Sequence, residues 1–276
     1  TGCLAERYRD EVMKEIPELD AVIGIGSNDK LCHIIRDVLC DKKSVCDFED
    51  KCKLPLDGGR IISTEPFYAY LKIAEGCDNC CTYCAIPSIR GRFRSRKIED
   101  ILEEAKWLAD NGVTEIVVIA QDTTRYGEDL YGENKFVELL RKISALDNIR
   151  SIRLLYCYPD KITDELIDTM AREPKIVKYL DIPVQHGSSS VLRRMGRKTT
   201  REKLEALIAE YVGTEKCACL NSQTACAEMA LRIMGIGEGD EVITSAYTYT
   251  ASASVIAHVG AKIILVDTQK DRLEMD

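Results

Sequence analysis

The chain has no long apolar run and no excess of basic residues, and we expect no secretory leader. No uncharged apolar run in its 276 residues approaches the roughly 20 residues that a membrane-spanning helix needs. The formal net charge is −8, which argues against indiscriminate binding to nucleic acid. The sequence opens with Thr1-Gly2-Cys3 and then a charged helical pattern, which is unlike a signal peptide. We therefore expect neither a membrane partner nor direct binding to nucleic acid.

Cysteine, in contrast, is abundant. In a protein without a leader, 13 cysteines predict metal ligation and free thiols rather than disulfides. The expected location is therefore the reducing environment of the cytoplasm. Cys40, Cys46 and Cys52 match no metal-binding spacing and are expected to be structural, and no role follows from the sequence for Cys32.

The most informative cysteines are Cys77, Cys81 and Cys84, which lie four and three residues apart. Three thiolates in one short loop can converge on a [4Fe–4S] cluster and leave its fourth iron without a protein ligand. S-adenosylmethionine can bind that iron through its amino and carboxylate groups, and the cluster then carries the hard chemistry. The alternative is a zinc knuckle, which needs a fourth Cys or His at a matched spacing. His33 and His186 are both far away in the sequence, so the spacing favours the cluster.

Two further features surround this motif. Cys80 lies inside it but off its spacing, and we expect it to be a bystander thiol. Residues 90–97 hold five cations in eight positions. Charge patterning leaves two interpretations of them open: a solvated basic turn, or donors for the carboxylate of S-adenosylmethionine or for an acidic macromolecular substrate.

From residue 67 onward, strands alternate with helices. The sequence predicts strands over 68–74, 114–120, 151–157 and 177–182, and helices over 97–111, 135–146, 163–171 and 188–195. Such alternation predicts right-handed βαβ units and a parallel sheet. With the cysteine loop after the first strand, the pattern indicates the opening of a (β/α) barrel whose site lies at the carboxyl ends of the strands.

The flanking segments have a different character. Before the barrel, the sequence predicts a helix over 4–15, a strand over 20–25 and a helix over 28–39, followed by an aperiodic linker over 40–62. After Gly213, it predicts helices over 225–234 and 251–258 and strands over 241–244 and 262–266. We therefore divide the chain into residues 1–39, 40–62, 63–206 and 207–276.

Residues 1–206 resemble the radical S-adenosylmethionine methylthiotransferases, and within them the RimO family. The matching stretches are 77–96 (CDNCCTYCAIPSIRGRFRSR), 120–132 (AQDTTRYGEDLYG), 154–166 (LLYCYPDKITDEL) and 179–200 (YLDIPVQHGSSSVLRRMGRKTT). The sister family MiaB, which acts on tRNA, usually has an acidic residue where this chain has Phe93, and it lacks the 120–132 signature. The tRNA enzyme is therefore the disfavoured alternative.

The resemblance implies specific roles. Cys77, Cys81 and Cys84 would hold the radical-generating cluster, and Tyr83 would contact the nucleoside of S-adenosylmethionine. Gln121 and Asp122 would lie near the methionine end of that cofactor. The substrate implied is an aspartate of small-subunit ribosomal protein twelve, and the implied electron donor is a flavodoxin or a ferredoxin.

The resemblance also implies that both ends of this chain are cut. Residues 1–39 look like the remnant of the family's N-terminal domain, where Cys3 matches the third ligand of a second, auxiliary cluster whose other two ligands would lie upstream. The chain has no initiator Met and stops shortly after a predicted strand. An incomplete or chimeric piece without activity is therefore an open alternative.

Residues 207–276 resemble a different family, the pyridoxal-phosphate-dependent sugar aminotransferases of the DegT/DnrJ/EryC1/StrS group. The match rests on the segments 211–214 (YVGT), 220–225 (LNSQTA), 235–244 (GIGEGDEVIT) and 247–252 (YTYTAS). It implies that Ser222 and Thr224 bind the cofactor phosphate at a helix N-terminus and that Tyr249 stacks on the pyridine ring. The lysines of the segment, Lys216, Lys262 and Lys270, do not match the Schiff-base position. We therefore expect a passenger fragment of an α/β domain rather than a working aminotransferase.

Overall fold

The computed structural model describes residues 1–41, 44–220 and 222–269. The chain divides into two compact units. The N-terminal unit comprises Thr1–Val184 and Ser190–Thr199, and the C-terminal unit comprises Gln185–Ser189 and Thr200–Asp276. Lys270 and the closing Met275-Asp276 lie outside the described residues, as does Asn221 of the 220–225 segment.

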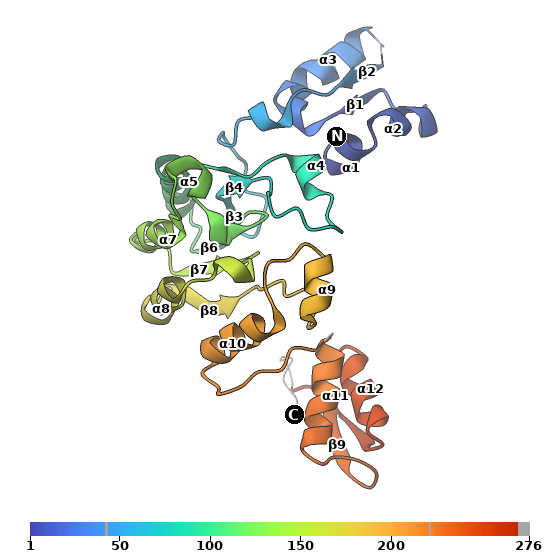
Figure 1. The fold of residues 1–276 in the computed structure, drawn as a ribbon. Helices are drawn as coiled ribbons and strands as arrows, with labels where there is room; N and C mark the ends of the chain where they lie inside the picture. Colours follow the sequence, from blue (N-terminus) through green and yellow to red (C-terminus); the bar gives the residue numbers. More distant parts are fainter. Residues whose placement is uncertain (42–43, 221, 270–276) are drawn as a thin grey trace. The chain divides into compact units, whose positions relative to one another are not determined.

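A parallel sheet forms the centre of the N-terminal unit (Figure 1). Its strands are β3 (Tyr68–Lys72), β6 (Glu115–Ile119), β7 (Ser151–Leu154) and β8 (Ile176–Leu180). Their order in the sheet is β3-β6-β7-β8, and each neighbouring pair is parallel. Strands that follow one another in both sequence and sheet are typical of the first part of a (β/α) barrel. The structure confirms the predicted α/β class with a parallel sheet.

Helices connect these strands and lie on the same side of the sheet in Figure 1. They are α5 (Ile98–Asp110), α7 (Phe136–Ser144) and α8 (Asp164–Arg172). The apolar stripe predicted for α5 is buried, since Ile101, Ala105 and Leu108 are each 0% exposed. Thr163 caps α8 by accepting a hydrogen bond from the Leu166 amide at 3.2 Å. Short elements occupy the loops: α6 (Glu128–Tyr131) and 3-10 helices over Thr123–Arg125 and Pro159–Lys161.

The strand predicted over 68–74 is interrupted. β3 ends at Lys72, and a separate two-residue strand, β4 (Ala74–Glu75), pairs antiparallel with β5 (Arg94–Ser95). Ile73 lies between them and still accepts a hydrogen bond from the Arg96 amide at 2.9 Å. The break arises because the chain leaves the sheet to pair with a segment that follows the cysteine loop. The loop and helix α4 (Ile86–Arg90) therefore lie between the two strands of a hairpin.

The N-terminal flank differs from its prediction in two places. The helix expected over 4–15 is two helices, α1 (Cys3–Arg7) and α2 (Arg9–Glu15), because Tyr8 has non-helical angles of φ −118° and ψ 38°. The stretch expected to be an aperiodic linker contains β2 (Val45–Asp47) and a 3-10 helix over Lys51–Lys53. The other elements are β1 (Ala21–Ile23), a 3-10 helix over Ile25–Lys30 and α3 (Leu31–Asp41). β2 pairs in parallel with β1, and a three-residue strand is too short to leave a periodic signal in the sequence.

The C-terminal unit is a smaller α/β structure. Its strands β9 (Glu241–Ser245) and β10 (Lys262–Val266) are parallel neighbours, and α12 (Ala251–His258) connects them. Val255 and Ile256 of α12 are buried, with α11 (Gln223–Ile233) contributing partly buried apolar residues to the same cluster. Helix α10 runs without a break from Arg201 to Val212, so the boundary expected at 206/207 falls inside one helix. The remaining element is α9 (Ser189–Arg194).

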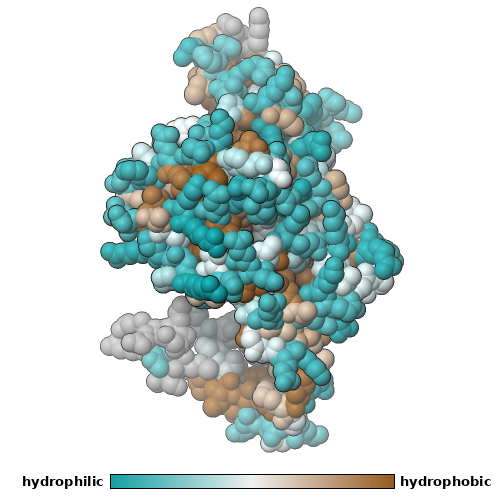
Figure 2. All heavy atoms as spheres, turned by 60° about the vertical axis from the view of Figure 1, so that its left-hand side comes forward, coloured by the Kyte–Doolittle hydropathy of each residue, from teal (hydrophilic) through white to brown (hydrophobic). Residues whose placement is uncertain are grey.

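The surface of the C-terminal unit carries many apolar side chains. Figure 2 shows them as brown patches at the bottom of the view. Large exposed fractions occur at the end of α11, on both strands and in the loop before α12: Ile233 77%, Ile243 60%, Tyr247 73%, Tyr249 80% and Leu265 60%. Apolar surface of this kind is ordinarily covered by further chain or by a partner. No described helix has the length and hydropathy of a membrane span.

Candidate functional site

The candidate site lies at the carboxyl edge of the parallel sheet. The cysteine loop follows β3 and β4, Gln121 and Asp122 follow β6, and Tyr156 and Tyr158 follow β7. In parallel α/β sheets, ligands bind at this edge because all the strand ends meet there. The structure therefore brings together the cysteines and the two polar residues predicted from the sequence.

Backbone contacts fix the conformation of the cysteine loop. Gly76 has a φ of +79°, and a Cβ at this position would lie 2.1 Å from the Arg92 carbonyl oxygen, so only glycine fits here. The Cys77 amide donates to the Gly91 carbonyl at 3.1 Å, and the Cys84 amide donates to the Cys81 carbonyl at 2.9 Å. Cys80, with a φ of 50°, adopts the left-handed conformation that is uncommon for residues other than glycine. The loop is thus held in one shape that includes a strained residue.

The three motif thiols differ in burial. Cys81 is buried, whereas Cys77 and Cys84 are half-buried and Cys80 is exposed. Burial raises the pKa of the Cys77 thiol, and the nearby charges of Cys81 and Cys84 raise this pKa further. Among the described residues, no three His, Cys, Asp or Glu side chains are placed to share a single metal ion. The assignment of Cys77, Cys81 and Cys84 to a cluster therefore stays a prediction from their spacing.

Asp122 connects the loop to the sheet. Its carboxylate is 0% exposed and accepts hydrogen bonds from Asn79 Nδ2 at 2.8 Å and from Thr124 Oγ1 at 2.7 Å. Burial raises the pKa of this carboxyl, against the opposing effect of those two hydrogen bonds. Beside it, Gln121 Oε1 is buried without a hydrogen-bond partner among the described residues. A buried acceptor with no partner marks a place where a ligand group can donate a hydrogen bond.

A second group of side chains surrounds the Cys81 sulfur. Tyr158 Oη lies 3.8 Å from Cys81 Sγ, and Arg197 Nη1 lies 3.9 Å from it. The guanidinium carbon of Arg197 is 3.8 Å from the centre of the Tyr158 ring, a stacked cation–π arrangement. Sequence reasoning missed Asn79, Tyr158 and Arg197, because nothing local distinguishes them from other polar residues. Only the position of Tyr158, shortly after a buried strand, was a usable signal.

Tyr83 and Tyr156 are exposed aromatic residues at the same edge. Tyr83 is 52% exposed, and burial together with a hydrogen bond to Cys81 raises the pKa of its phenol. Tyr156 is 50% exposed and has a φ of 58°. Its strained backbone is held by hydrogen bonds to Asp181 Oδ2 and from the Thr123 amide, at 3.0 and 3.1 Å. The contact between Tyr83 and a nucleoside stays a prediction.

Three of the five cations in the basic stretch 90–97 bind other parts of the N-terminal unit. Arg90 pairs with Glu75 at 3.4 Å, and Arg96, which is 4% exposed, pairs with Glu104 at 2.6 Å. Arg94 donates to the carbonyls of Lys51, Cys52 and Leu54 at 2.6–3.0 Å. These guanidinium groups therefore tie the hairpin to the rest of the unit. Arg92 is the exception, with a side chain that is 87% exposed.

The remaining predicted residues belong to other elements than those that form this edge. Cys3 begins α1, a helix that contacts α4, and its role as an auxiliary ligand stays a prediction. In the C-terminal unit, Ser222 caps α11 by accepting a hydrogen bond from the Ala225 amide at 3.1 Å. Thr224 lies in the first turn of α11, and Tyr249 precedes α12 with 80% of its surface exposed. The predicted pyridoxal phosphate contacts of these three residues are not tested by the structure.

Comparison with known proteins identifies the family. The model of the radical SAM superfamily matches residues 71–212, just over half of the 276 residues, and includes the cysteine loop. The chain belongs to the radical SAM superfamily. Within it, the ribosomal protein uS12 methylthiotransferase RimO of Clostridium tetani is 50% identical over 212 residues, which are 76% of this chain and 47% of that protein. The RimO protein of Caldanaerobacter subterraneus is 53% identical over 209 residues, 75% of this chain and 48% of that protein.

These comparisons confirm the predicted resemblances at both ends of the chain. The chain spans about half the length of the curated RimO relatives. The DegT/DnrJ/EryC1/StrS aminotransferase family model matches residues 185–276. A solved protein of Streptococcus pneumoniae, described as a sugar aminotransferase, is 53% identical over 27% of this chain and 19% of its own, with a TM-score of 0.27.

The described thiols fit the iron–sulfur cluster that radical SAM proteins use. A [4Fe–4S] cluster takes one thiolate at each of several irons, so its ligands need to face a common space rather than meet at one ion. Cys77, Cys81 and Cys84 lie in one short loop after β4, where Cys81 is buried and the other two are half-buried. The buried, unpartnered Gln121 Oε1 nearby suits a polar cosubstrate.

Proposed function

We propose that residues 63–206 form the cofactor-binding core of a methylthiotransferase that modifies an aspartate of ribosomal protein uS12. The observation that carries this proposal is the 50–53% identity to RimO proteins across the cysteine loop and the whole sheet. Because the chain spans about half of those relatives, the complete reaction belongs to a longer enzyme.

In this proposal, Cys77, Cys81 and Cys84 hold one [4Fe–4S] cluster that leaves an iron open for S-adenosylmethionine. When bound, the cluster supplies the single electron that cleaves the sulfonium, and it takes that electron from a donor such as a flavodoxin or a ferredoxin. The chain's own residues would bind and orient S-adenosylmethionine. The Gln121 carbonyl oxygen can accept a hydrogen bond from the amino group of the methionine end, because it is buried and has no partner among the described residues.

Asp122 stabilises the conformation of the cysteine loop. It holds Asn79, two residues from Cys77, and so keeps the loop in the shape that presents its thiols. Tyr83 is exposed beside Cys81 and can cover the nucleoside. Cys3 would supply one thiolate to an auxiliary cluster that delivers sulfur. With its abundant free thiols, the protein suits the reducing cytoplasm.

Anaerobic reconstitution with iron and sulfide tests the cluster assignment. We expect about four irons per chain, the content of one [4Fe–4S] cluster. Replacing Cys77, Cys81 and Cys84 together by Ala abolishes this content, whereas Cys80→Ala serves as the matched control and retains it. A triple variant that still binds four irons contradicts the assignment.

A further inference from the structure

Arg197 is a buried cation without an ordinary counter-ion. The residue is 6% exposed. Its Nη2 donates to the Pro183 carbonyl at 2.6 Å, and its Nε is buried without a hydrogen-bond partner in the described part of the chain. None of the ion pairs found among the described residues involves Arg197. A buried charge is costly unless it is paired, so the environment of Arg197 requires a negative group close by.

A Cys81 thiolate would be such a group. The Cys81 sulfur lies 3.9 Å from Nη1, and Cys81 is itself buried, with 9% of its surface exposed. Two contacts hold the Arg197 guanidinium group in this orientation. It stacks on the ring of Tyr158, and its Nη2 donates to the Pro183 carbonyl. The contact joins residues 116 positions apart, from the cysteine loop to the segment after α9. As a thiolate ligand, Cys81 would neutralise Arg197.

We propose that Arg197 is a positioning residue that pairs with the Cys81 thiolate and raises the reduction potential of the cluster. This inference rests on the proposed function, because it needs the cluster on Cys77, Cys81 and Cys84. One-electron reduction by an external low-potential donor adds one negative charge to the cluster and no proton. A fixed cation beside a ligand sulfur stabilises that added charge, and burial strengthens the effect because the surroundings screen it weakly.

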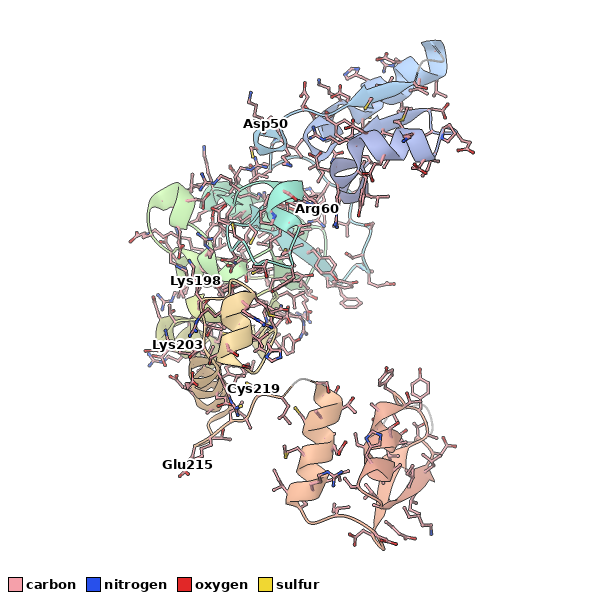
Figure 3. The ribbon with its side chains drawn as sticks, turned by 45° about the vertical axis from the view of Figure 1, so that its right-hand side comes forward. Asp50, Arg60, Lys198, Lys203, Glu215 and Cys219 are labelled. Atoms are coloured by element: carbon pink, nitrogen blue, oxygen red, sulfur yellow. The ribbon has the colours of Figure 1, made fainter. Side chains whose placement is uncertain are left out.

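The test is a redox titration of the reconstituted 276-residue chain, followed by the electron paramagnetic resonance signal of the reduced cluster. Arg197→Met removes the charge, and Arg197→Lys keeps the charge without the planar fork. Lys198→Met is the matched control, because Lys198 is the next residue and is exposed (Figure 3). Water and salt screen an exposed charge.

We expect Arg197→Met to lower the equilibrium constant for reduction at least tenfold, which is about 59 mV for one electron. Arg197→Lys retains most of the wild-type potential, and Lys198→Met leaves it unchanged. If Arg197→Met loses its iron while Arg197→Lys keeps iron and potential, the pairing is supported as well. Equal potentials in wild type and Arg197→Met, or an equal fall in Arg197→Lys and Arg197→Met, overturn the inference alone. A wild-type chain that binds no cluster overturns the proposed function first.

Discussion

Asn79 and Asp122 join the cysteine loop to the segment that follows β6, the second strand of the sheet, through a hydrogen bond of 2.8 Å. The two residues are 43 positions apart, and the carboxylate that accepts this bond is 0% exposed. Thr124 supplies the second hydrogen bond to the same carboxylate. The shape of the loop that presents the thiols therefore depends on hydrogen bonding to the Asp122 carboxyl group, whose pKa is raised by burial.

The first prediction concerns the pH dependence that Asp122 produces. Burial raises the pKa of this carboxyl above the ordinary value of 3.8, so the folded protein holds the proton more tightly than the unfolded chain. Its contribution to stability is therefore fully present below pH 3.8 and is lost as the pH rises through the folded pKa. Asp122→Asn, which cannot ionise, lacks this loss. We expect the variant to gain stability relative to wild type as the pH rises from about 4 to 7, measured by urea unfolding of the protein without iron.

Asp110→Asn is the control for this measurement, because Asp110 pairs with Lys106 on the surface with a side chain that is 53% exposed. Surface pairs of this kind contribute about 0–1 kcal/mol. If the difference between Asp122→Asn and wild type does not change with pH, or falls as the pH rises, then Asp122 does not have a raised pKa.

The second prediction concerns Gly76. Alanine there would meet the Arg92 carbonyl oxygen at 2.1 Å, in addition to the strain of a φ of +79°. Gly132 is the matched control, since its φ is +77° and its Cβ would meet nothing within 4 Å. Both substitutions cost about 1–2 kcal/mol for the left-handed backbone, and overpacking adds about 1–3 kcal/mol to Gly76→Ala alone. Equal losses of unfolding free energy in the two variants would show that the close approach does not exist.

The third prediction concerns the auxiliary cluster. Within this chain Cys3 is the one cysteine that matches the pattern of the auxiliary ligands, and a single thiolate does not hold a [4Fe–4S] cluster. Cys3→Ala is therefore expected to leave the iron content of the reconstituted chain at about four per chain. Iron and sulfide analysis with Mössbauer spectroscopy measures this. Additional iron in the wild-type chain that disappears in Cys3→Ala would refute the prediction.

The fourth prediction tests whether residues 207–276 act as an aminotransferase or are a fragment without that activity. Ser222 already accepts a hydrogen bond from the Ala225 amide as the cap of α11, and Tyr249 is exposed. No lysine of residues 207–269 matches the Schiff-base position of the family. After incubation with pyridoxal phosphate and borohydride reduction, peptide mapping is expected to show no single lysine labelled stoichiometrically within residues 207–276. One specifically labelled lysine, together with amino transfer to a keto-sugar nucleotide, would overturn the passenger interpretation.

Local sequence patterns alone predict much of the fold and of the candidate site. Neighbouring residues define both the spacing of Cys77, Cys81 and Cys84 and the alternation of strands with helices. Both could therefore be recognised from the sequence. The same reasoning correctly predicted that Gln121 and Asp122 follow a buried strand, because the carboxyl ends of parallel strands share one edge. It erred at Tyr8, whose backbone angles are not helical, and at the break between β3 and β4, where the chain leaves the sheet to pair with β5.

The tertiary structure decided everything that depends on distant partners. Arg94 and Arg96 read as a basic surface in the sequence, but they bind carbonyls near Leu54 and the carboxylate of Glu104. The contact of Arg197 with Cys81 spans 116 positions. Charge patterns and spacings carry no information about such partners, because burial and counter-ions exist only once the chain has folded. The sequence therefore predicts the ligands of the candidate site, and only the fold shows which distant residues contact the loop that carries them.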